Sequence, residues 1–275
     1  NMISICLKLS FHLVIFKFPK DETGVEHGMT KQDNGDFIIA LNDTGIGTIY
    51  GFRLEGPFND PGLIIADPYS KAAITQNSMH HVAKSLVVDD TYDWEDDTWI
   101  HIDPRDLIIY EMHVRDMTAH PTSTTCQKGT YAGLVEAGQN GGIEHIQYMG
   151  VNAVQILPIQ DFANFEVPFK DNKAPIYNDW NPYERNHWGY MTTFFFAPES
   201  YYASDGTDIP GSWNGIDGRS IDEIKGMVKA FHKKDIAVIM DVVYNHVSNY
   251  DWNPLKYIDR EMYFRLDKND DYIAH

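Results

Sequence analysis

The sequence predicts an α/β fold in which a small antiparallel β-sandwich precedes the first three βα units of an incomplete TIM (β/α)8 barrel. Up to about Val88, short strand-like stretches alternate with Gly, Pro, Asn and Asp and show no convincing helix, which is typical of an antiparallel β-domain. After Pro104, apolar strands alternate with amphipathic helices, which indicates parallel strands with helices outside them. The residues that follow Pro104 are fewer than the ~250 of a closed barrel, so we expect a truncated one.

Three segments are expected along the chain. Residues 1–30 are unassigned and form either a strand pair or the remnant of a truncated domain. Residues 31–104 form the β-sandwich, with the stretches "DFIIAL", "GTIYGFRL" and "GLIIADPYS", and end in an acidic, tryptophan-bearing linker. Residues 105–275 form the N-terminal part of the barrel, so we expect the chain to be a fragment of a larger protein.

Two architectures fit the β-α-β-α-β order after Pro104, an open doubly wound sheet and an eight-stranded barrel. A dinucleotide-binding open sheet carries a glycine fingerprint after its first strand, and "HVRDMTAHPTS" has none. A long aromatic-rich insertion also separates the second strand from the second helix. Because the loops after the strands carry the site in a barrel, this insertion favours the barrel.

The segment 220–234 carries the clearest helix signals. Ser220 and Glu223 match a capping box, and two lysines at the end suit the negative end of the helix dipole. One face is apolar: Ile221, Ile224, Val228 and Phe231. The stretch "IAVIMD" follows as the third strand and is predicted to be buried on both faces.

Composition excludes several classes of partner. With 22 Lys and Arg against 40 Asp and Glu, the formal net charge is −18, which repels nucleic acid and anionic membrane surfaces. No apolar run reaches the ~20 residues of a membrane span, and no clear signal peptide distinguishes a secreted from a cytoplasmic protein. The aromatic content of 13% suits stacking on sugar rings.

All three predicted barrel strands are followed by an aspartate: Asp116, Asp161 and Asp241. Each either holds the mouth of the barrel as a hydrogen-bonded spacer or forms part of an active site, because barrel sites lie at the carboxyl ends of the strands. The spacer interpretation is favoured for Asp116 and Asp161. Asp241 is a site candidate because it directly ends an apolar run and because Asn245 and His246 follow one turn later.

The triplet Trp188, Gly189 and Tyr190 is a second candidate. A glycine between two large rings leaves room for a ligand or a backbone, and Tyr190 could stack on a pyranose ring. Simple loop packing is the alternative.

No metal site is predicted. The stretch "DKNDD" at Asp267 lacks the Gly and the closing Glu of a calcium loop. His80 and His81 are adjacent and cannot share one face of a strand.

Four stretches carry a family resemblance, and they occur in the order "IIYEMHVRDMT", "GVNAVQILPIQDF", "NHWGYMTTFFFAPESYYAS" and "VIMDVVYNH". They resemble the first three βα units of glycoside hydrolase family 13, the α-amylase superfamily, and within it the pullulanase and isoamylase type of debranching enzyme. The region "IYGFRLEGP…IIADPYSKA" is similar to the family 48 carbohydrate-binding module that precedes the barrel there. The resemblance covers about residues 36–275.

The resemblance implies a role for each candidate residue. Asp241 is implied to lie beside the catalytic centre, Tyr190 to stack under the sugar in the cleavage subsite, and His246 to hydrogen-bond that sugar. Further support of the active site is implied for Asn245, Trp188 and Asp161.

The resemblance also implies an activity, the retaining cleavage of α-1,6 branch bonds in pullulan, starch or glycogen, with an α-glucan as partner. No cofactor is required, although a calcium ion accompanies many members of the family. The nucleophile, acid and stabiliser follow the fourth, fifth and seventh strands of the family's barrel. We therefore expect no catalytic carboxylate in this chain and no hydrolytic activity from it alone.

Three alternatives remain open at this point. An isoamylase-like or branching enzyme of the same family shares every motif above. A non-catalytic α-glucan-binding protein could use the β-domain and Tyr190 without chemistry. In a third, Asp116, Asp161 and Asp241 are themselves a complete hydrolytic set.

Overall fold

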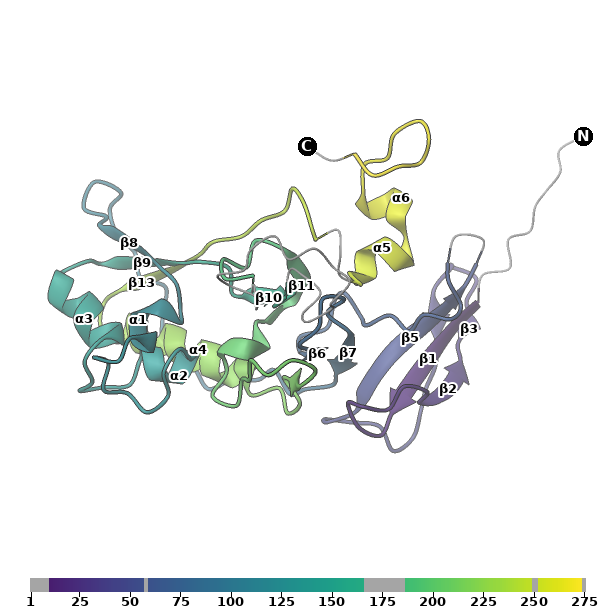
Figure 1. Cartoon of the computed structure of the whole chain (residues 1–275), viewed down its shortest axis with the longest axis horizontal. Helices are drawn as coiled ribbons and strands as arrows, with labels where there is room; N and C mark the ends of the chain where they lie inside the picture. Colours follow the sequence, from purple (N-terminus) through teal and green to yellow (C-terminus); the bar gives the residue numbers. More distant parts are fainter. Residues whose placement is uncertain (1–9, 57–58, 166–185, 249–251, 274–275) are drawn as a thin grey trace, which may run out of the picture.

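The structure, a computed structural model, describes residues 10–56, 59–165, 186–248 and 252–273. They form two parts that lie side by side, a part dominated by an antiparallel sheet and an α/β part (Figure 1). Within these residues no helix combines the length and the apolar character needed to cross a bilayer.

The first part is a six-stranded antiparallel sheet in the order β12-β6-β7-β5-β1-β2. Its strands are β1 (Ser10–Phe16), β2 (Val25–Gly28), β5 (Ile49–Glu55), β6 (Ala73–Gln76), β7 (Ala83–Leu86) and β12 (Trp213–Asn214). Alternation along β1 buries Val14 and Phe16, which pack with Ile74 and Leu86 in the core of this part. The predicted antiparallel β-domain is therefore present.

The sheet departs from the expected segments in three ways. Residues 10–30 are not a separate segment, because β1 pairs with β5 over its whole length, from Ser10↔Glu55 to Phe16↔Ile49. The strand pair expected in this segment is confirmed, since β1 also pairs with β2. Instead of a two-layer sandwich, the described strands form this one sheet and a short ribbon of β3 (Thr30–Lys31) and β4 (Phe37–Ile38). Finally, β12 comes from the segment 105–275 and yet completes the sheet by pairing with β6.

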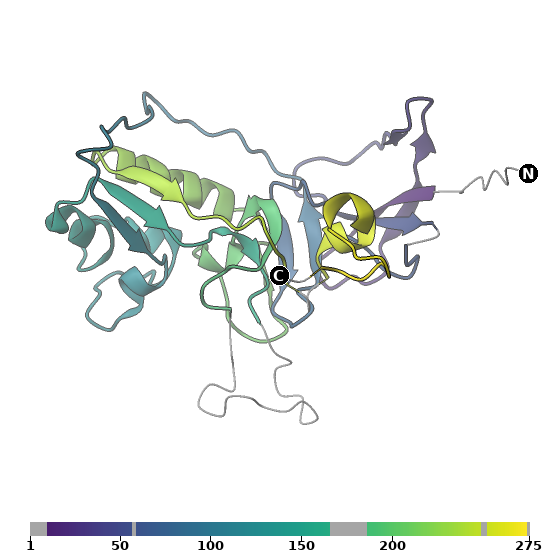
Figure 2. The ribbon, with the colours of Figure 1, turned by 90° about the horizontal axis from the view of Figure 1, so that it is seen from above.

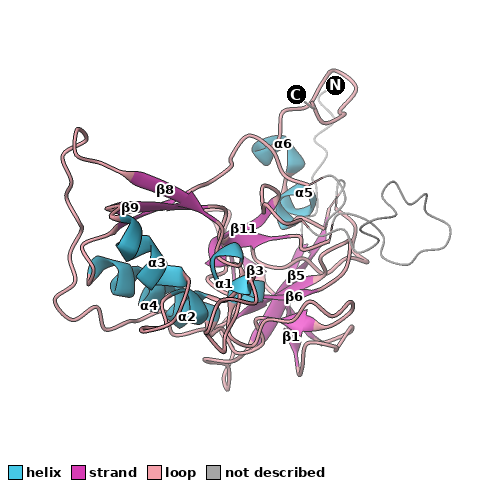
Figure 3. Ribbon diagram, turned by 60° about the vertical axis from the view of Figure 1, so that its left-hand side comes forward, coloured by secondary structure: helices cyan, strands magenta, loops and turns pink. Residues whose placement is uncertain are grey.

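The second part contains a three-stranded parallel sheet in the order β13-β9-β8. Its strands are β8 (Ile109–Met112), β9 (Ala153–Ile156) and β13 (Ala237–Met240). Four helices lie on one side of this sheet (Figure 1, Figure 3): α1 (Asp116–Ala119), α2 (Tyr131–Leu134), α3 (Gly142–Met149) and α4 (Ser220–His232). The predicted β-α-β-α-β order with parallel strands is confirmed.

Burial differs between the three parallel strands. Val154 and Ile156 of the central strand β9 are fully buried, whereas Ile109 of β8 and Met240 of β13 are each 46% exposed. The prediction that the third strand is buried on both faces is therefore wrong for the described residues. The physical reason is position, because β8 and β13 are the outer strands of this sheet and only β9 has a partner on each side.

Helix α4 packs against both parts of the molecule. Ile221, at its start, lies in the core of the antiparallel sheet, while Met227 and Phe231 lie in the α/β core. The predicted capping box is wrong, since Ser220 is buried within the helix and Glu223 accepts hydrogen bonds from the amide and hydroxyl of Ser204. Glu223 therefore braces a neighbouring loop and leaves the helix start uncapped by side chains.

The large apolar side chain of Phe231 provides a test of this core. Because Phe231 is 0% exposed, we expect Phe231→Ala to lower the free energy of unfolding by about 3–5 kcal/mol in urea titrations. Phe18→Ala is the matched control, since Phe18 is 50% exposed and its loss should cost less than about 1 kcal/mol. Equal costs for the two variants would contradict the placement of Phe231.

The acidic linker, residues 89–104, runs along the outside of α4 (Figure 2). Lys229 Nζ lies 2.8 Å from a carboxylate oxygen of Glu95, and His232 Nδ1 lies 2.9 Å from one of Asp97. Basic side chains on successive turns of one helix thus hold the linker that joins the two parts.

A hairpin lies at the junction of the two parts and leads to the candidate site. It consists of β10 (Gln160–Phe162) and β11 (Thr192–Pro198), which pair antiparallel with irregular register, and η1 (Ser200–Tyr202) follows it. After β13 the chain ends in α5 (Pro254–Ile258) and α6 (Arg260–Tyr263). The hairpin therefore carries Tyr190 just before β11.

Candidate active site

Tyr190 and Asp241 come together from different elements. Tyr190 precedes β11, Asp241 follows β13, and the Tyr190 hydroxyl donates to Asp241 Oδ2 at 2.7 Å. The Asp241 amide continues the parallel ladder by donating to the carbonyl of Ile156 on β9 at 3.0 Å. The backbone of Asp241 is thus fixed by the sheet, and its side chain receives the tyrosine from the hairpin.

Burial and the contact with Asp241 raise the pKa of the Tyr190 phenol. Partial burial, then the hydrogen bond and charge of Asp241, and finally the charge of Glu111 on β8 raise the pKa of Tyr190 to about 12. At neutral pH the phenol is therefore protonated and donates its hydrogen bond to Asp241. The arrangement is a half-buried tyrosine ring held beside a negative charge.

Gly189 sets the position of Tyr190. Its φ is +75°, a conformation that favours glycine, and a Cβ at this position would lie 2.6 Å from Cε1 of Phe162. Its amide donates to Oδ1 of Asn186 at 3.1 Å. In the structure the space that glycine leaves is filled by the Phe162 ring of β10, so local packing accounts for Gly189.

The other residues of the predicted site lie near the surface. His246 and Asn245 are exposed on the loop that follows β13, with His246 Nδ1 3.3 Å from Oδ1 of Asn245. Trp188 is 56% exposed and meets the ring of His187 edge to face, with centroids 5.0 Å apart. Among the described residues, the structure thus joins Tyr190 to Asp241 and leaves these three side chains open to solvent.

Asp161 is enclosed instead of facing solvent. Its carboxylate is 0% exposed, with Oδ1 2.8 Å from Nε2 of His81 and Oδ2 3.5 Å from the Ser200 hydroxyl. Asp116 is exposed on α1 and lies 3.2 Å from Nε2 of His187. Since Asp161 does not reach solvent in this conformation, the geometry does not favour a hydrolytic set of Asp116, Asp161 and Asp241.

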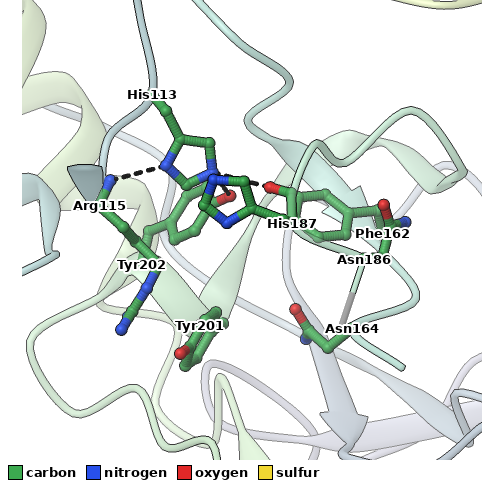
Figure 4. Close-up of a pocket in the computed structure, with 8 residues that line it drawn as sticks. All are labelled: His113, Arg115, Phe162, Asn164, Asn186, His187, Tyr201 and Tyr202. Atoms are coloured by element: carbon green, nitrogen blue, oxygen red, sulfur yellow. Dashed lines mark hydrogen bonds between the residues drawn. The ribbon is translucent and has the colours of Figure 1, made fainter. Parts of the chain in front are cut away.

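Figure 4 shows a small cavity whose lining includes Phe162 and Asn186, the two residues that contact Gly189. Its volume is about 30 Å³, enough for about one water molecule. It is lined by His113, Arg115, Phe162, Asn164, Asn186, His187, Tyr201 and Tyr202.

His113 forms one wall of this cavity and is neutral at physiological pH. Burial, followed by repulsion from His187, lowers the pKa of His113 to about 4. His113 Nδ1 accepts the amide proton of Arg115 at 3.1 Å, and Nε2 lies 2.8 Å from the carbonyl oxygen of His187 and 3.0 Å from the Tyr202 hydroxyl. Both ring nitrogens are therefore engaged.

His113, Asp116 and His187 place possible metal-ligand atoms within 4.8 Å of one another, the one such group in the part of the chain that the structure describes. Because both nitrogens of His113 have protein partners and Nε2 of His187 is paired with Asp116, an ion would bind here only after these contacts rearrange. The cluster was not predicted, since the two histidines lie far apart in the sequence. It suits hydrogen bonding better than metal binding.

Glu199 is a second residue that the sequence patterns did not reveal. It is fully buried and accepts the amide protons of Phe162 at 3.0 Å and Tyr201 at 2.8 Å. Burial, and then the neighbouring charge of Asp161, raise the pKa of Glu199 well above its usual range. Its position in the sequence could have revealed it. Glu199 directly follows the apolar run "FFFAP", where a solvated glutamate is not expected.

The chain is similar in sequence to several known enzymes, although no family model matches it. It is 34% identical over 222 residues to isoamylase 1 of Arabidopsis thaliana, and the match covers 73% of this chain and 26% of the relative. It is 31% identical over 288 residues to a GlgX homologue of Mycobacterium bovis, with 91% of this chain and 37% of the relative covered. The chain is homologous to debranching enzymes of glycoside hydrolase family 13.

Solved structures of family 13 enzymes agree with these relatives. The structure matches the pullulanase of Paenibacillus barengoltzii with a TM-score of 0.73 and 28% identity, covering 95% of this chain and 38% of that one. It matches the pullulanase of Bacillus acidopullulyticus with a TM-score of 0.72 and 25% identity, covering 96% and 30%. The α/β fold is therefore that of part of a pullulanase, and the chain spans about a third of these family 13 enzymes.

Proposed function

We propose that this chain is part of a retaining glycoside hydrolase that cleaves α-1,6 branch bonds in pullulan, starch or glycogen. The observation that carries the proposal is the Tyr190–Asp241 pair, which lies after the carboxyl end of a parallel strand in a chain homologous to isoamylases and pullulanases. Two solved pullulanases contain α-glucans, one as a complex with maltohexaose and alpha-cyclodextrin and one with maltotetraose. An α-glucan is therefore the proposed partner.

We propose that β8, β9 and β13 are the first three strands of a (β/α)8 barrel. They are parallel, and they follow one another in space as in sequence. Parallel sheets are normally covered on both faces, yet Ile109 and Met240 on the outer strands are each 46% exposed. Further strands and helices of the whole protein would cover these side chains.

We propose that the antiparallel sheet corresponds to the family 48 carbohydrate-binding module. Support comes from its place before the parallel strands and from the resemblance of residues 49–72. Because β12, which follows the parallel strand β9 in sequence, is a strand of this sheet and Ile221 of α4 lies in its core, the sheet would act as a fixed partner of the barrel.

In the proposed site, Tyr190 would stack under the sugar ring and Asp241 would place a negative charge beside it. His246, exposed on the same loop as Asn245, would hydrogen-bond the sugar. Trp188 would line the entrance, and Asp161 would support the site from beneath the hairpin.

The chemistry needs more than these residues. A retaining glycosidase uses two carboxyl groups about 5 Å apart, one as nucleophile and one as acid/base. We propose that the whole protein supplies both from strands beyond this chain, and that this chain supplies one wall of the cleft. This scheme requires no cofactor, and it is compatible with a calcium ion bound near Asn245.

The proposal is tested with the whole protein that contains this chain. We expect it to release reducing sugar from pullulan and to lower the α-1,6 content of glycogen, measured by NMR. A branching enzyme would raise the α-1,6 content instead, and an isoamylase-like enzyme would favour glycogen over pullulan. Glucan binding without any change in linkage would contradict a hydrolase and support a non-catalytic binding protein.

A further inference from the structure

We propose that His81, in the antiparallel sheet, is a positioning residue for the candidate active site and acts through Asp161 on the hairpin that carries Tyr190. The inference rests on the proposed function, because its readout is hydrolysis. The antiparallel sheet would then help to position the active site, in addition to any role in binding glucan.

His81 is held in an unusual conformation. It lies in the turn between β6 and β7 with φ +48°, a left-handed value that is uncommon for a residue other than glycine. It is 1% exposed, and its amide donates to the carbonyl of Ser78 at 3.0 Å. Such a conformation persists only where its surroundings enforce it, and here it brings Nε2 to 2.8 Å from Asp161 Oδ1.

The unpaired side of the ring indicates where the proton lies. Nδ1 of His81 is buried and has no hydrogen-bond partner among the residues that the structure describes. A proton on Nδ1 would be a buried unpaired donor, which is costly, so the geometry favours a proton on Nε2, facing Asp161. The imidazole therefore donates one directed hydrogen bond across the boundary between the two parts.

The position of Asp161 affects Tyr190 through Phe162, the next residue of β10. Asp161 contacts His81, and Phe162 follows it directly in β10. The Phe162 ring occupies the position that a Cβ on Gly189 would take, and Gly189 precedes Tyr190. A shift of Asp161 would therefore move Phe162 and alter the approach of Tyr190 to Asp241.

A second set of contacts, through Ser200, joins the hairpin to the antiparallel sheet. The hydroxyl of Ser200 lies 3.5 Å from Oδ2 of Asp161 and 3.3 Å from the hydroxyl of Thr75 on β6. The register of β10 against β11 also shifts on both sides of Asp161, and such irregularities re-aim side chains next to active sites. The antiparallel sheet thus contacts the hairpin at Asp161, where the register between β10 and β11 changes.

A matched pair of variants in the whole protein tests the proposal. His81→Gln keeps an N–H group at about the reach of Nε2, whereas His81→Asn suits the left-handed backbone but is too short to reach Asp161. With pullulan as substrate, we expect His81→Asn to lower kcat about tenfold with KM changed less than about twofold, and His81→Gln to keep most of the activity. Asn214→Ala is the control, since it removes another buried side-chain hydrogen bond of the antiparallel sheet, to Asn77 at 3.1 Å, and should leave kcat within about twofold.

A second arm distinguishes positioning from general support of the fold. If His81 acts through Tyr190, His81→Asn should change kcat by less than about twofold in a Tyr190→Phe background, because the coupled residues are not additive. Equal kcat for the Asn and Gln variants, a loss confined to KM, a similar loss for Asn214→Ala, or additive losses with Tyr190→Phe would each overturn the proposal. An inactive parent protein would instead overturn the proposed function, and this inference with it.

Discussion

Asp241→Asn is expected to lower kcat/KM on pullulan by about 10²-fold or more in the whole protein. Glycoside cleavage passes through a transition state with positive charge on the sugar ring, and a carboxylate beside the ring stabilises that charge. Asparagine keeps the size of the side chain and an acceptor for the Tyr190 hydroxyl, but it removes the charge. The measurement is reducing-sugar release at several substrate concentrations.

Two companion variants separate charge from geometry. Tyr190→Phe keeps the ring and removes the 2.7 Å hydrogen bond, so we expect a smaller loss, about tenfold. Asp96→Asn removes a charge from the exposed linker and should leave the rate unchanged. Full activity of Asp241→Asn would show that Asp241 does not border the reacting sugar.

Gly189→Ala is expected to lower both stability and activity. The methyl group would meet the Phe162 ring at 2.6 Å in a backbone conformation of φ +75°, so we expect a loss of roughly 2–4 kcal/mol in the free energy of unfolding. Because the hairpin must shift to admit the methyl group, Tyr190 should move from Asp241 and kcat should fall about tenfold or more. Urea titration and pullulan kinetics measure the two effects.

The chain offers a close control for this variant. Gly211 has a similar φ of +78°, but no atom lies within 4 Å of the place that a methyl group would take, so Gly211→Ala shows the cost of the backbone conformation alone. That cost should be about 1 kcal/mol, and kcat should not change. In Gly189→Ala, a further change of Phe162→Leu should restore part of the stability, since it shortens the side chain that collides. Identical costs at Gly189 and Gly211 would contradict the clash.

The periodic elements of the α/β part could be predicted from the sequence. Ile143 and Ile146 mark the buried face of α3, Ile221 and Phe231 that of α4, and the apolar run at Val154 marks the central strand. Local patterns suffice here because burial of one face is imposed by the 3.6-residue and 2-residue periods. The capping box at Ser220 failed because a tertiary contact, Glu223 to Ser204, outweighed a local one.

The candidate site was predicted only in part. Asp241 could be found because a carboxylate that ends an apolar strand is costly to bury without a partner. Its partner Tyr190 was a candidate on its own, and the hydrogen bond that joins them depends on the path of the hairpin. His113 carried no periodic or spacing signal that separates it from a solvated histidine, and for Glu199 only its position after an apolar run indicated burial.

The sequence by itself determined the order of strands and helices, the apolar faces that build the two cores, the acidic surface and the resemblance to debranching enzymes. Only the tertiary structure decided which polar residues meet: Tyr190 with Asp241, and His81 with the buried Asp161. It also decided that the first strand and β12 belong to one sheet. The reason is that hydrophobic periods act within about ten residues, whereas hydrogen bonds between elements depend on how the whole chain packs.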